Sequence, residues 1–169
     1  MITGVILTGG RSRRFGRNKA LATVGGERLI DRGLAALKPH CDPLLVVAND
    51  LRPYFGLPAT LVRDFVPDQG PLMGIYTALM CSPNPWILAR AVDMPFFTPP
   101  LLVAMMQECK ETVEVVVPLV ADQYEPLFAL YHRRCLGAIR AVLEEARRQI
   151  IAFYPRVRVR TFTEAEWRV

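Results

Sequence analysis

Short runs of apolar, mostly β-branched residues alternate along the chain with longer stretches in which apolar residues recur every three or four positions. The short runs predict strands, each bounded by Gly, Pro or Asp, at residues 5–7, 44–49, 61–65, 86–93 and 113–121. The periodic stretches predict helices over residues 27–38, 70–81 and 100–111. Strands that alternate with helices are typical of an α/β fold with a mostly parallel sheet.

The pattern changes after the fifth predicted strand. Residues 113–135 favour two strands flanking the triplet 121–123, and a basic helix follows over 134–148. We therefore predict a three-layer α/β sandwich with a Rossmann-like, mostly parallel sheet and a late antiparallel hairpin. Neither an internal repeat nor a low-complexity linker interrupts residues 1–169, so a single domain is expected.

Composition and charge add only broad limits. The 169 residues are 51% hydrophobic and carry a net charge of +5, which suits one soluble domain with an anionic partner: a phosphorylated small molecule, a nucleic acid or a membrane surface. No segment approaches the ~20 apolar residues of a membrane span. The four cysteines form no CxxC pair, which favours neither a zinc site nor a disulfide framework, and a reducing cytoplasm is the expected location.

A basic, glycine-rich segment follows the first predicted strand. Residues 8–19, TGGRSRRFGRNK, contain four arginines, one lysine and three glycines. In a parallel α/β sheet ligands bind beyond the carboxyl ends of the strands, and a glycine turn can direct backbone N–H groups at an anion. The spacing matches neither a Walker A loop nor GxGxxG. We predict a polyphosphate site with Arg14 and Lys19 as its cations; the alternative is a solvated basic loop.

Asp93 ends an apolar strand, and Met94 and Pro95 stop that strand. A carboxylate beside a phosphate loop is a natural Mg²⁺ ligand, because Mg²⁺ prefers one or two carboxylates together with phosphate oxygens and water. The alternative is that Asp93 caps the helix expected to begin near Thr98 or closes the turn before proline.

A third loop precedes the helix predicted at 70–81. Gly70 and Gly74 leave room near the helix N-terminus for a planar ring or an anion. Asp64 and Asn49 each end a strand, where they could accept hydrogen bonds from a base or a ribose. For either residue taken alone, capping of the strand end or formation of a turn is the commoner explanation.

These segments carry a resemblance to a known family. LTGGRSRRFGRNKA resembles the LAGGxxxRMGxDKA signature of nucleotidyltransferases that activate sugars or cofactors. Together with VVAND, the Asp64 segment, QGPLMGIYTAL, the turn at residues 93–96 and EPLFALY, it is similar to the molybdenum cofactor guanylyltransferase family. The similarity extends over about residues 4–160.

The resemblance implies a nucleotide-diphospho-sugar transferase type of fold and a specific reaction. Members of the family use Mg²⁺ and GTP to transfer GMP onto the terminal phosphate of molybdopterin carrying molybdenum, which yields a guanine dinucleotide cofactor and pyrophosphate. The expected partners are these substrates and, transiently, other molybdenum cofactor biosynthesis proteins or molybdoenzymes, without nucleic acid or membrane.

The family pattern places the roles residue by residue. The positions that match its nucleotide and metal contacts are Leu7, Thr8, Gly9, Lys19, Asn49, Asp64, Gly74 and Asp93. Gly10 and Gly70, from the two glycine turns, complete the expected GTP-binding residues. Arg14, Lys19 and Asp93 are the expected catalytic residues, and Asp93 is the expected Mg²⁺ ligand.

The chain departs from the family pattern at three places. Thr8 replaces an alanine, and Asn18 replaces an aspartate. Family members end with an Asn-x-Asn-Thr-Pro-like segment, whereas this sequence stops at TFTEAEWRV without it. Truncation of the segment and its absence from this member both stay open, and a second metal ligand and part of the molybdopterin pocket are unassigned.

Two other functions remain open at this point. One is a related nucleotidyltransferase that uses CTP on molybdopterin or another nucleoside triphosphate on a sugar phosphate. The other is a nucleic-acid-binding module built on the basic loop and the RVRVR segment at 156–160, although that alternation is more typical of an edge strand with one solvated face.

Overall fold

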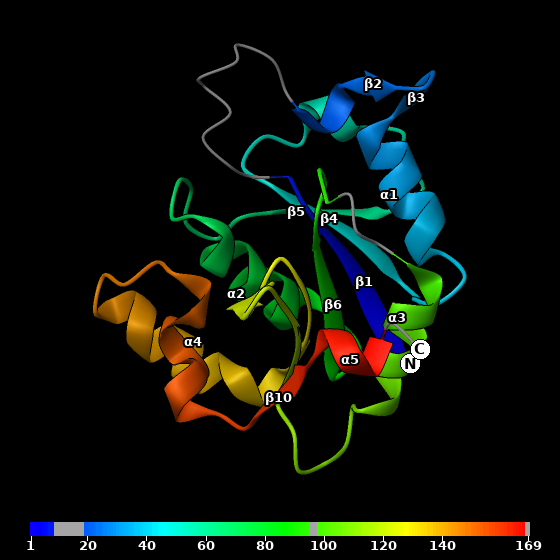
Figure 1. Ribbon diagram of the computed structural model, residues 1–169. Helices are drawn as coiled ribbons and strands as arrows, with labels where there is room; N and C mark the ends of the chain where they lie inside the picture. Colours follow the sequence, from blue (N-terminus) through cyan, green and yellow to red (C-terminus); the bar gives the residue numbers. More distant parts are fainter. Residues whose placement is uncertain (9–18, 95–97, 168–169) are drawn as a thin grey trace.

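The computed structural model describes residues 1–8, 19–94 and 98–167 (Figure 1). Its centre is a mixed sheet with the strand order β10-β7-β9-β6-β1-β4-β5, to which β8 adds by pairing with β7. The strands are β1 (Ile2–Leu7), β4 (Leu44–Ala48), β5 (Thr60–Arg63), β6 (Trp86–Ala91), β7 (Val115–Val120), β8 (Gln123–Tyr124), β9 (Phe128–His132) and β10 (Val159–Phe162).

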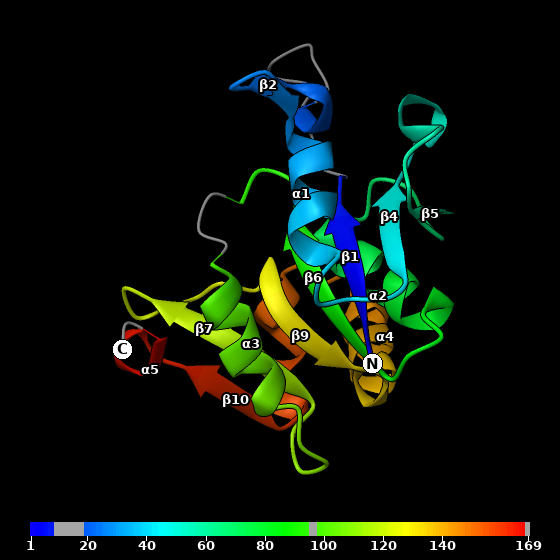
Figure 2. The same cartoon turned by 90° about the vertical axis from the view of Figure 1, so that its right-hand side faces the viewer.

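Helices cover both faces of this sheet (Figures 1 and 2). The α-helices are α1 (Leu29–Leu37), α2 (Pro71–Cys81), α3 (Pro99–Gln107), α4 (Leu136–Glu144) and α5 (Glu164–Trp167). Buried side chains of α1 and α3 form one core with one face of the sheet, and those of α2 and α4 form a second core with the other face. The predicted three-layer α/β sandwich is therefore confirmed.

The apolar character of these helices reflects packing against the sheet. None of the helices in the described part of the chain combines the length and the apolarity needed to cross a membrane.

Strand direction decides which loops meet. β5, β4, β1 and β6 are parallel neighbours, β9 runs antiparallel between β6 and β7, and β7 pairs in parallel with β10. The carboxyl ends of β5, β4, β1, β6, β7 and β10 therefore open onto one edge of the sheet, which we call the carboxyl edge.

The predicted helix at 27–38 was wrong at its start. Glu27–Arg28 form the short strand β3, which pairs with β2 (Thr23–Val24) in a separate two-stranded sheet. Gly25 and Gly26 have φ values of 63° and 85°, a conformation that suits glycine and allows a two-residue hairpin turn. The turn geometry therefore overrides the helical periodicity at Glu27 and Arg28.

The predicted helices at 100–111 and 134–148 were too long. Helix α3 ends at Gln107. Helix α4 extends only from Leu136 to Glu144, and the short 3₁₀-helix η4 (Arg133–Cys135) precedes it. Ala146 has φ of 57°, a left-handed conformation that cannot continue an α-helix.

The late hairpin differs from the prediction in its second strand. Ala121 and Asp122 turn the chain with φ of 47° and 60°, but the partner β8 has only two residues, and the longer strand β9 begins at Phe128. The predicted edge strand at 156–160 is displaced: β10 forms at residues 159–162 because the 3₁₀-helix η5 (Ile150–Arg156) extends into the RVRVR segment.

Candidate functional site

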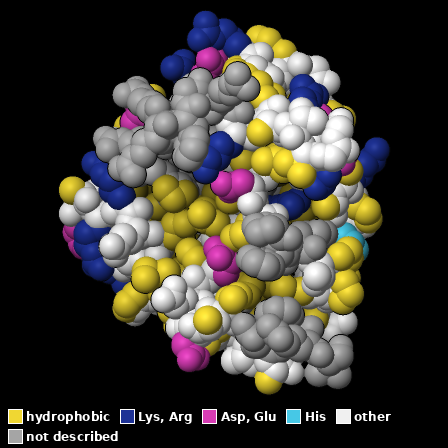
Figure 3. Space-filling model, turned by 45° about the horizontal axis from the view of Figure 1, so that its top comes forward, with side chains coloured by type: hydrophobic (Ala, Val, Ile, Leu, Met, Phe, Trp, Pro, Cys, Tyr) yellow, Lys and Arg dark blue, Asp and Glu magenta, His cyan; other side chains and the backbone are white. Residues whose placement is uncertain are grey.

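Residues from four separate strands meet at the carboxyl edge. Leu7 pairs in register with Val47 of β4 and with Ala91 of β6, and Ala48 pairs with Arg63 of β5. The residues that follow these strands are therefore brought side by side: Thr8, Asn49, Asp64 and Asp93. Figure 3 looks toward this edge, where lysine and arginine side chains lie above and to either side of an area that shows apolar and acidic side chains.

Lys19 and Asp93 form an ion pair across this edge. Lys19 begins the 3₁₀-helix η2 (Lys19–Leu21), and its Nζ lies 3.6 Å from Oδ2 of Asp93, with the two side chains 49% and 50% exposed. The chain turns at Asp93 because the N–H of Met94 donates back to the carbonyl of Ala91 at 3.3 Å. A cation and a carboxylate, both open to solvent, thus lie together at the end of β6.

The alternative interpretation of Asp93 as a helix cap does not fit the fold. The N-cap of α3 is Thr98, five residues beyond Asp93, and the side chain of Thr98 makes no capping hydrogen bond. Asp93 contacts Lys19 instead.

The start of α2 packs closely on β1 and leaves Asp64 beside it. A Cβ atom added to Gly74 would lie 3.1 Å from Cδ2 of Leu7 and 3.7 Å from Oδ1 of Asp64. Gly70 is the N-cap of α2 with φ of 81°, a left-handed conformation that favours glycine, and Pro71 fills the first helical position. The missing side chain at Gly74 therefore allows α2 to pack closely on β1, while Gly70 provides the backbone conformation that starts the helix.

The carboxyl group of Asp64 is partly withdrawn from water. Burial raises its pKa above the ordinary aspartate value, and a hydrogen bond with the Thr77 side chain lowers the pKa by a smaller amount. Its Oδ1 is buried and accepts no hydrogen bond from the described residues. A buried acceptor of this kind favours a ligand that brings a donor.

Asn49 borders a cavity beside the ends of β4 and β5. Its Oδ1 is likewise buried and accepts no hydrogen bond from any residue that the structure describes. The adjoining pocket has a volume of about 410 Å³, and its lining residues are Asn49, Asp50, Leu51, Arg52, Phe55 and Arg63. Apart from Asn49, the sequence did not single these residues out; Arg63 directly precedes Asp64, and Phe55 is an exposed aromatic residue.

Thr8 and Leu7 belong to the sheet more than to an open site. The Thr8 hydroxyl donates to the carbonyl of Val47 at 3.0 Å, and the Thr8 N–H donates to the same oxygen at 3.1 Å. Leu7 is buried, and its carbonyl accepts from the N–H of Val92 at 3.3 Å. The predicted site residues Gly9, Gly10 and Arg14 lie outside the described residues.

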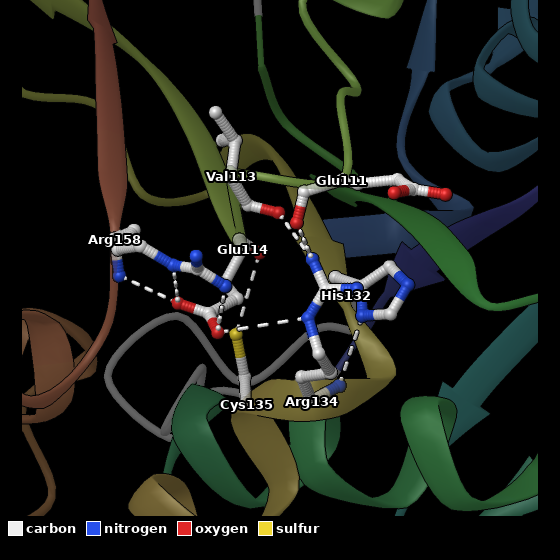
Figure 4. A network of polar contacts seen from close by, with 7 residues as sticks. All are labelled: Glu111, Val113, Glu114, His132, Arg134, Cys135 and Arg158. Carbon is white, nitrogen blue, oxygen red and sulfur yellow. Dashed lines mark hydrogen bonds and ion pairs between the residues drawn. The ribbon is translucent and has the colours of Figure 1, made fainter.

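A second group of charged residues lies at the opposite end of the sheet (Figure 4). Glu114 accepts hydrogen bonds from the backbone N–H of Arg158 at 2.7 Å and from its Nη2 at 3.1 Å, and it lies 3.6 Å from Nε of Arg134. Hydrogen bonding to Arg158 is the main reason that the pKa of Glu114 is lowered. The N–H of Arg134 donates to Nδ1 of His132, and burial raises the pKa of the neighbouring Cys135 thiol to about 12. This group joins β10, β7 and β9 and is a structural network.

A divalent metal fits the carboxyl edge only with help from a substrate. The described residues contain no group of three or more His, Cys, Asp or Glu side chains that could hold a metal ion. Asp93 supplies one accessible carboxylate, and Mg²⁺ is commonly held by one carboxylate, phosphate oxygens and water. The donor set therefore suits a metal that arrives with a polyphosphate.

Comparisons with known proteins place the chain among nucleotidyltransferases. Residues 4–159 match the family described as the MobA-like NTP transferase domain. A molybdenum cofactor guanylyltransferase of Desulfosudis oleivorans is 38% identical over 168 residues, which cover 99% of this chain and 83% of the relative.

Solved structures show the same fold at lower sequence identity. Molybdopterin-guanine dinucleotide biosynthesis protein A from Archaeoglobus fulgidus superposes with a TM-score of 0.84 at 24% identity, covering 99% of this chain and 86% of that one. The 2-C-methyl-D-erythritol 4-phosphate cytidylyltransferase from Thermus thermophilus gives 0.71 at 17% identity, covering 96% and 89%. Enzymes with different nucleotides and acceptors thus share this sheet.

Proposed function

Since the chain belongs to the MobA-like NTP transferase domain family and is therefore a nucleotidyltransferase, we propose that it transfers GMP from GTP to molybdenum-molybdopterin. The acceptor is the terminal phosphate of molybdopterin, and the products are the molybdopterin guanine dinucleotide cofactor and pyrophosphate. The observation that carries this proposal is the Lys19–Asp93 pair at the end of β6, beside the strand end that leads into the basic loop.

The chemistry requires charge to be held in place. The acceptor phosphate attacks the α-phosphorus of GTP in line, and negative charge grows on the departing pyrophosphate. The ammonium group of Lys19 would oppose that charge, together with Arg14 of the basic loop. A phosphate acceptor is already ionised near pH 7, so neither a protein nucleophile nor a strong general base is needed.

We propose Mg²⁺ as the metal, with Asp93 as its protein ligand. When bound, the ion would neutralise phosphate charge and link the nucleotide to the end of β6. Asp93 would hold the ion through its carboxylate, and the ammonium group of Lys19, which lies beside that carboxylate, would face the phosphates. The family relation supports a divalent metal, and the accessible carboxylate of Asp93 supports Mg²⁺.

The nucleoside is proposed to lie over β1, β4 and β5. Asp64 and Asn49 each offer a buried oxygen that can accept from the ribose or the base. Gly70 and Gly74 carry no side chain at the start of α2, and we propose that a planar ring approaches the strand ends there. Leu7, Thr8, Gly9 and Gly10 are proposed to contact the nucleotide as well.

Turnover with different nucleotides tests the proposal. Pyrophosphate release is measured with molybdenum-molybdopterin and GTP, CTP or UTP in the presence of Mg²⁺, and we expect turnover with GTP alone. Equal rates with CTP would replace the proposal with the related cytidylyl transfer. Binding to mixed oligonucleotides that GTP and Mg²⁺ fail to reduce would favour a nucleic-acid-binding module.

The variant Asp93→Asn tests the metal ligand. It keeps the side-chain shape but removes the charge, so we expect loss of Mg²⁺-dependent turnover with an unchanged thermal unfolding midpoint. The matched control is Asp31→Asn. Asp31 lies in the first turn of α1 and also forms an ion pair near the surface, with Arg28 at the N-cap of that helix. Near-normal activity of Asp93→Asn would remove Asp93 from the metal site.

We further propose that the protein acts in the cytoplasm and contacts other molybdenum cofactor biosynthesis proteins or molybdoenzymes transiently. A product built from a labile metal cofactor has to pass from one protein to the next, which supports short-lived contacts.

A further inference from the structure

Glu125 lies in the loop between β8 and β9, which precedes the strand next to β6 and is at the same edge of the sheet as Asp93. β9 pairs antiparallel with β6, with Arg90 opposite Phe128, and the N–H of Ala91 donates to the carbonyl of Leu127 at 2.8 Å. Asp93 lies two residues after Ala91, and Glu125 lies two residues before Leu127. Because the two strands are antiparallel, both residues lie at the same edge of the sheet. The β8–β9 loop therefore borders the Lys19–Asp93 pair on the side away from β1, β4 and β5.

The backbone holds Glu125 in place, and its carboxylate has no side-chain partner among the described residues. Its N–H donates to the carbonyl of Pro118 at 2.9 Å, and its own carbonyl accepts from the N–H of Phe128 at 3.1 Å. The carboxylate accepts a backbone hydrogen bond from Leu127, yet burial still raises its pKa. Across residues 1–8, 19–94 and 98–167, it forms neither an ion pair nor a hydrogen bond to another side chain. A half-buried carboxylate in this state is stabilised by added N–H donors.

An exposed aromatic ring precedes this carboxylate. Tyr124 is 42% exposed, and its ring lies 5.3 Å from that of Tyr154 in an edge arrangement. The hydroxyl groups of Tyr154 and Tyr131 lie 3.1 Å apart, and the Tyr131 hydroxyl also donates to the carbonyl of Pro126 at 2.7 Å. Glu125 directly follows Tyr124 and directly precedes Pro126, whose carbonyl accepts from the Tyr131 hydroxyl. A flat apolar surface and an acceptor for N–H groups thus occur together.

We propose that Glu125 and Tyr124 form the subsite for the pterin ring of the acceptor. A pterin presents an amino group at C2 and an N–H at N3, and a carboxylate can accept both in a two-point contact. The ring of Tyr124 offers a surface for packing against the heterocycle. This inference rests on the proposed function, since it identifies the acceptor that the transferase recognises.

The position of Glu125 along the carboxyl edge favours binding of the acceptor there rather than of the nucleotide. The residues proposed for guanosine follow β4 and β5 or lie on α2, and Lys19 and Asp93 mark the centre of the phosphate site. Because the two substrates must be bound together for in-line transfer, the ends of β6, β9 and β7 remain for the acceptor. Glu125 lies on that half.

Direct binding tests this subsite without turnover. The probes are neopterin phosphate and the corresponding lumazine phosphate, in which an oxygen replaces the C2 amino group. Calorimetry or quenching of the ring fluorescence gives the affinities. We expect the wild-type protein to prefer the pterin about tenfold, the gain associated with a hydrogen bond to a charged acceptor.

The variant Glu125→Gln should remove this preference. Its affinity for the pterin is expected to fall about tenfold, to the level of the lumazine, while its affinity for GTP stays the same. The matched control Glu144→Gln changes a carboxylate on α4 whose side chain is 71% exposed, and it should retain the preference. Tyr124→Leu tests the ring contact and should weaken both probes equally.

The outcomes separate this inference from the proposed function. If the wild-type protein binds GTP and transfers GMP but does not distinguish the two rings, or if Glu125→Gln retains the preference, the pterin subsite at Glu125 is wrong. If the wild-type protein neither binds GTP nor transfers GMP, the proposed function itself fails. A circular dichroism spectrum and a thermal midpoint for each variant show that the fold is intact.

Discussion

The substitution Gly74→Ala separates binding from folding at the proposed guanosine site. Gly74 is the fourth residue of α2, and its Cα faces Leu7, Val47 and Asp64. The added Cβ would lie 3.1 Å from Cδ2 of Leu7, 3.7 Å from Oδ1 of Asp64 and 3.9 Å from Cγ1 of Val47. Only the first of these distances is shorter than an ordinary contact.

The effect on folding is expected to be small because two contributions oppose each other. Replacing glycine by alanine within a helix stabilises it by about 1 kcal/mol. Overpacking a core costs about 1–3 kcal/mol, and the lower end applies because a terminal methyl of Leu7 needs to move by only ~0.4 Å to restore normal contact. The free energy of unfolding should therefore change by less than about 1 kcal/mol.

The effect on GTP binding should be much larger. The methyl group would occupy the space beside Oδ1 of Asp64, where the guanosine is proposed to lie. We expect the dissociation constant for GTP to rise at least about tenfold, which corresponds to about 1.4 kcal/mol of binding free energy.

Calorimetric titration with GTP and urea unfolding measure the two effects on the same samples. Gly137→Ala provides the control, because Gly137 also lies in the first turns of a helix but a Cβ there would meet no atom within 4 Å. That control should bind GTP normally and gain about 0.5–1 kcal/mol of stability. GTP affinity of Gly74→Ala within a factor of about two of the wild type would refute the placement of the guanosine against α2.

Two further substitutions test charges at opposite ends of the sheet. Lys19→Ala should cost about 3 kcal/mol of transition-state stabilisation, roughly a hundredfold in the rate of GMP transfer, by analogy with the loss of one preorganised donor. Lys110→Ala, which also breaks an exposed ion pair, serves as its control, and equal rates for the two variants would exclude a role for Lys19. Glu114→Gln should lower the free energy of unfolding by about 1 kcal/mol near pH 7, since the partners Arg158 and Arg134 are largely exposed. Because the pKa of Glu114 is lowered in the folded state, its contribution is present above the unfolded-state pKa and is lost as the pH falls through the folded-state pKa. The urea unfolding midpoints of the wild type and of Glu114→Gln should therefore differ near pH 7 and converge near pH 3. A difference between the two proteins that is independent of pH would mean that packing, not charge, is responsible.

The sequence by itself determined the layers of the fold and the local chemistry at each strand end. Hydrophobic periodicity is a local property, so the α2 helix and the strands β1, β4 and β6 could be placed within a few residues. The predicted positions of Lys19, Asn49, Asp64 and Asp93 depended on which residues follow an apolar run, and this is also visible in the chain alone. The ordered motifs then supplied the family resemblance that the matching family profile confirms.

Only the tertiary structure decided which strand ends are neighbours. A period of two residues is the same in a parallel and an antiparallel strand, so no local pattern shows that β9 inserts between β6 and β7. This insertion places Glu125 beside the end of β6, and the β1–β6 pairing places Lys19 within 3.6 Å of a carboxylate 74 positions further along the chain. Such contacts depend on strand order and register, which result from the packing of the whole sheet between its two helical layers.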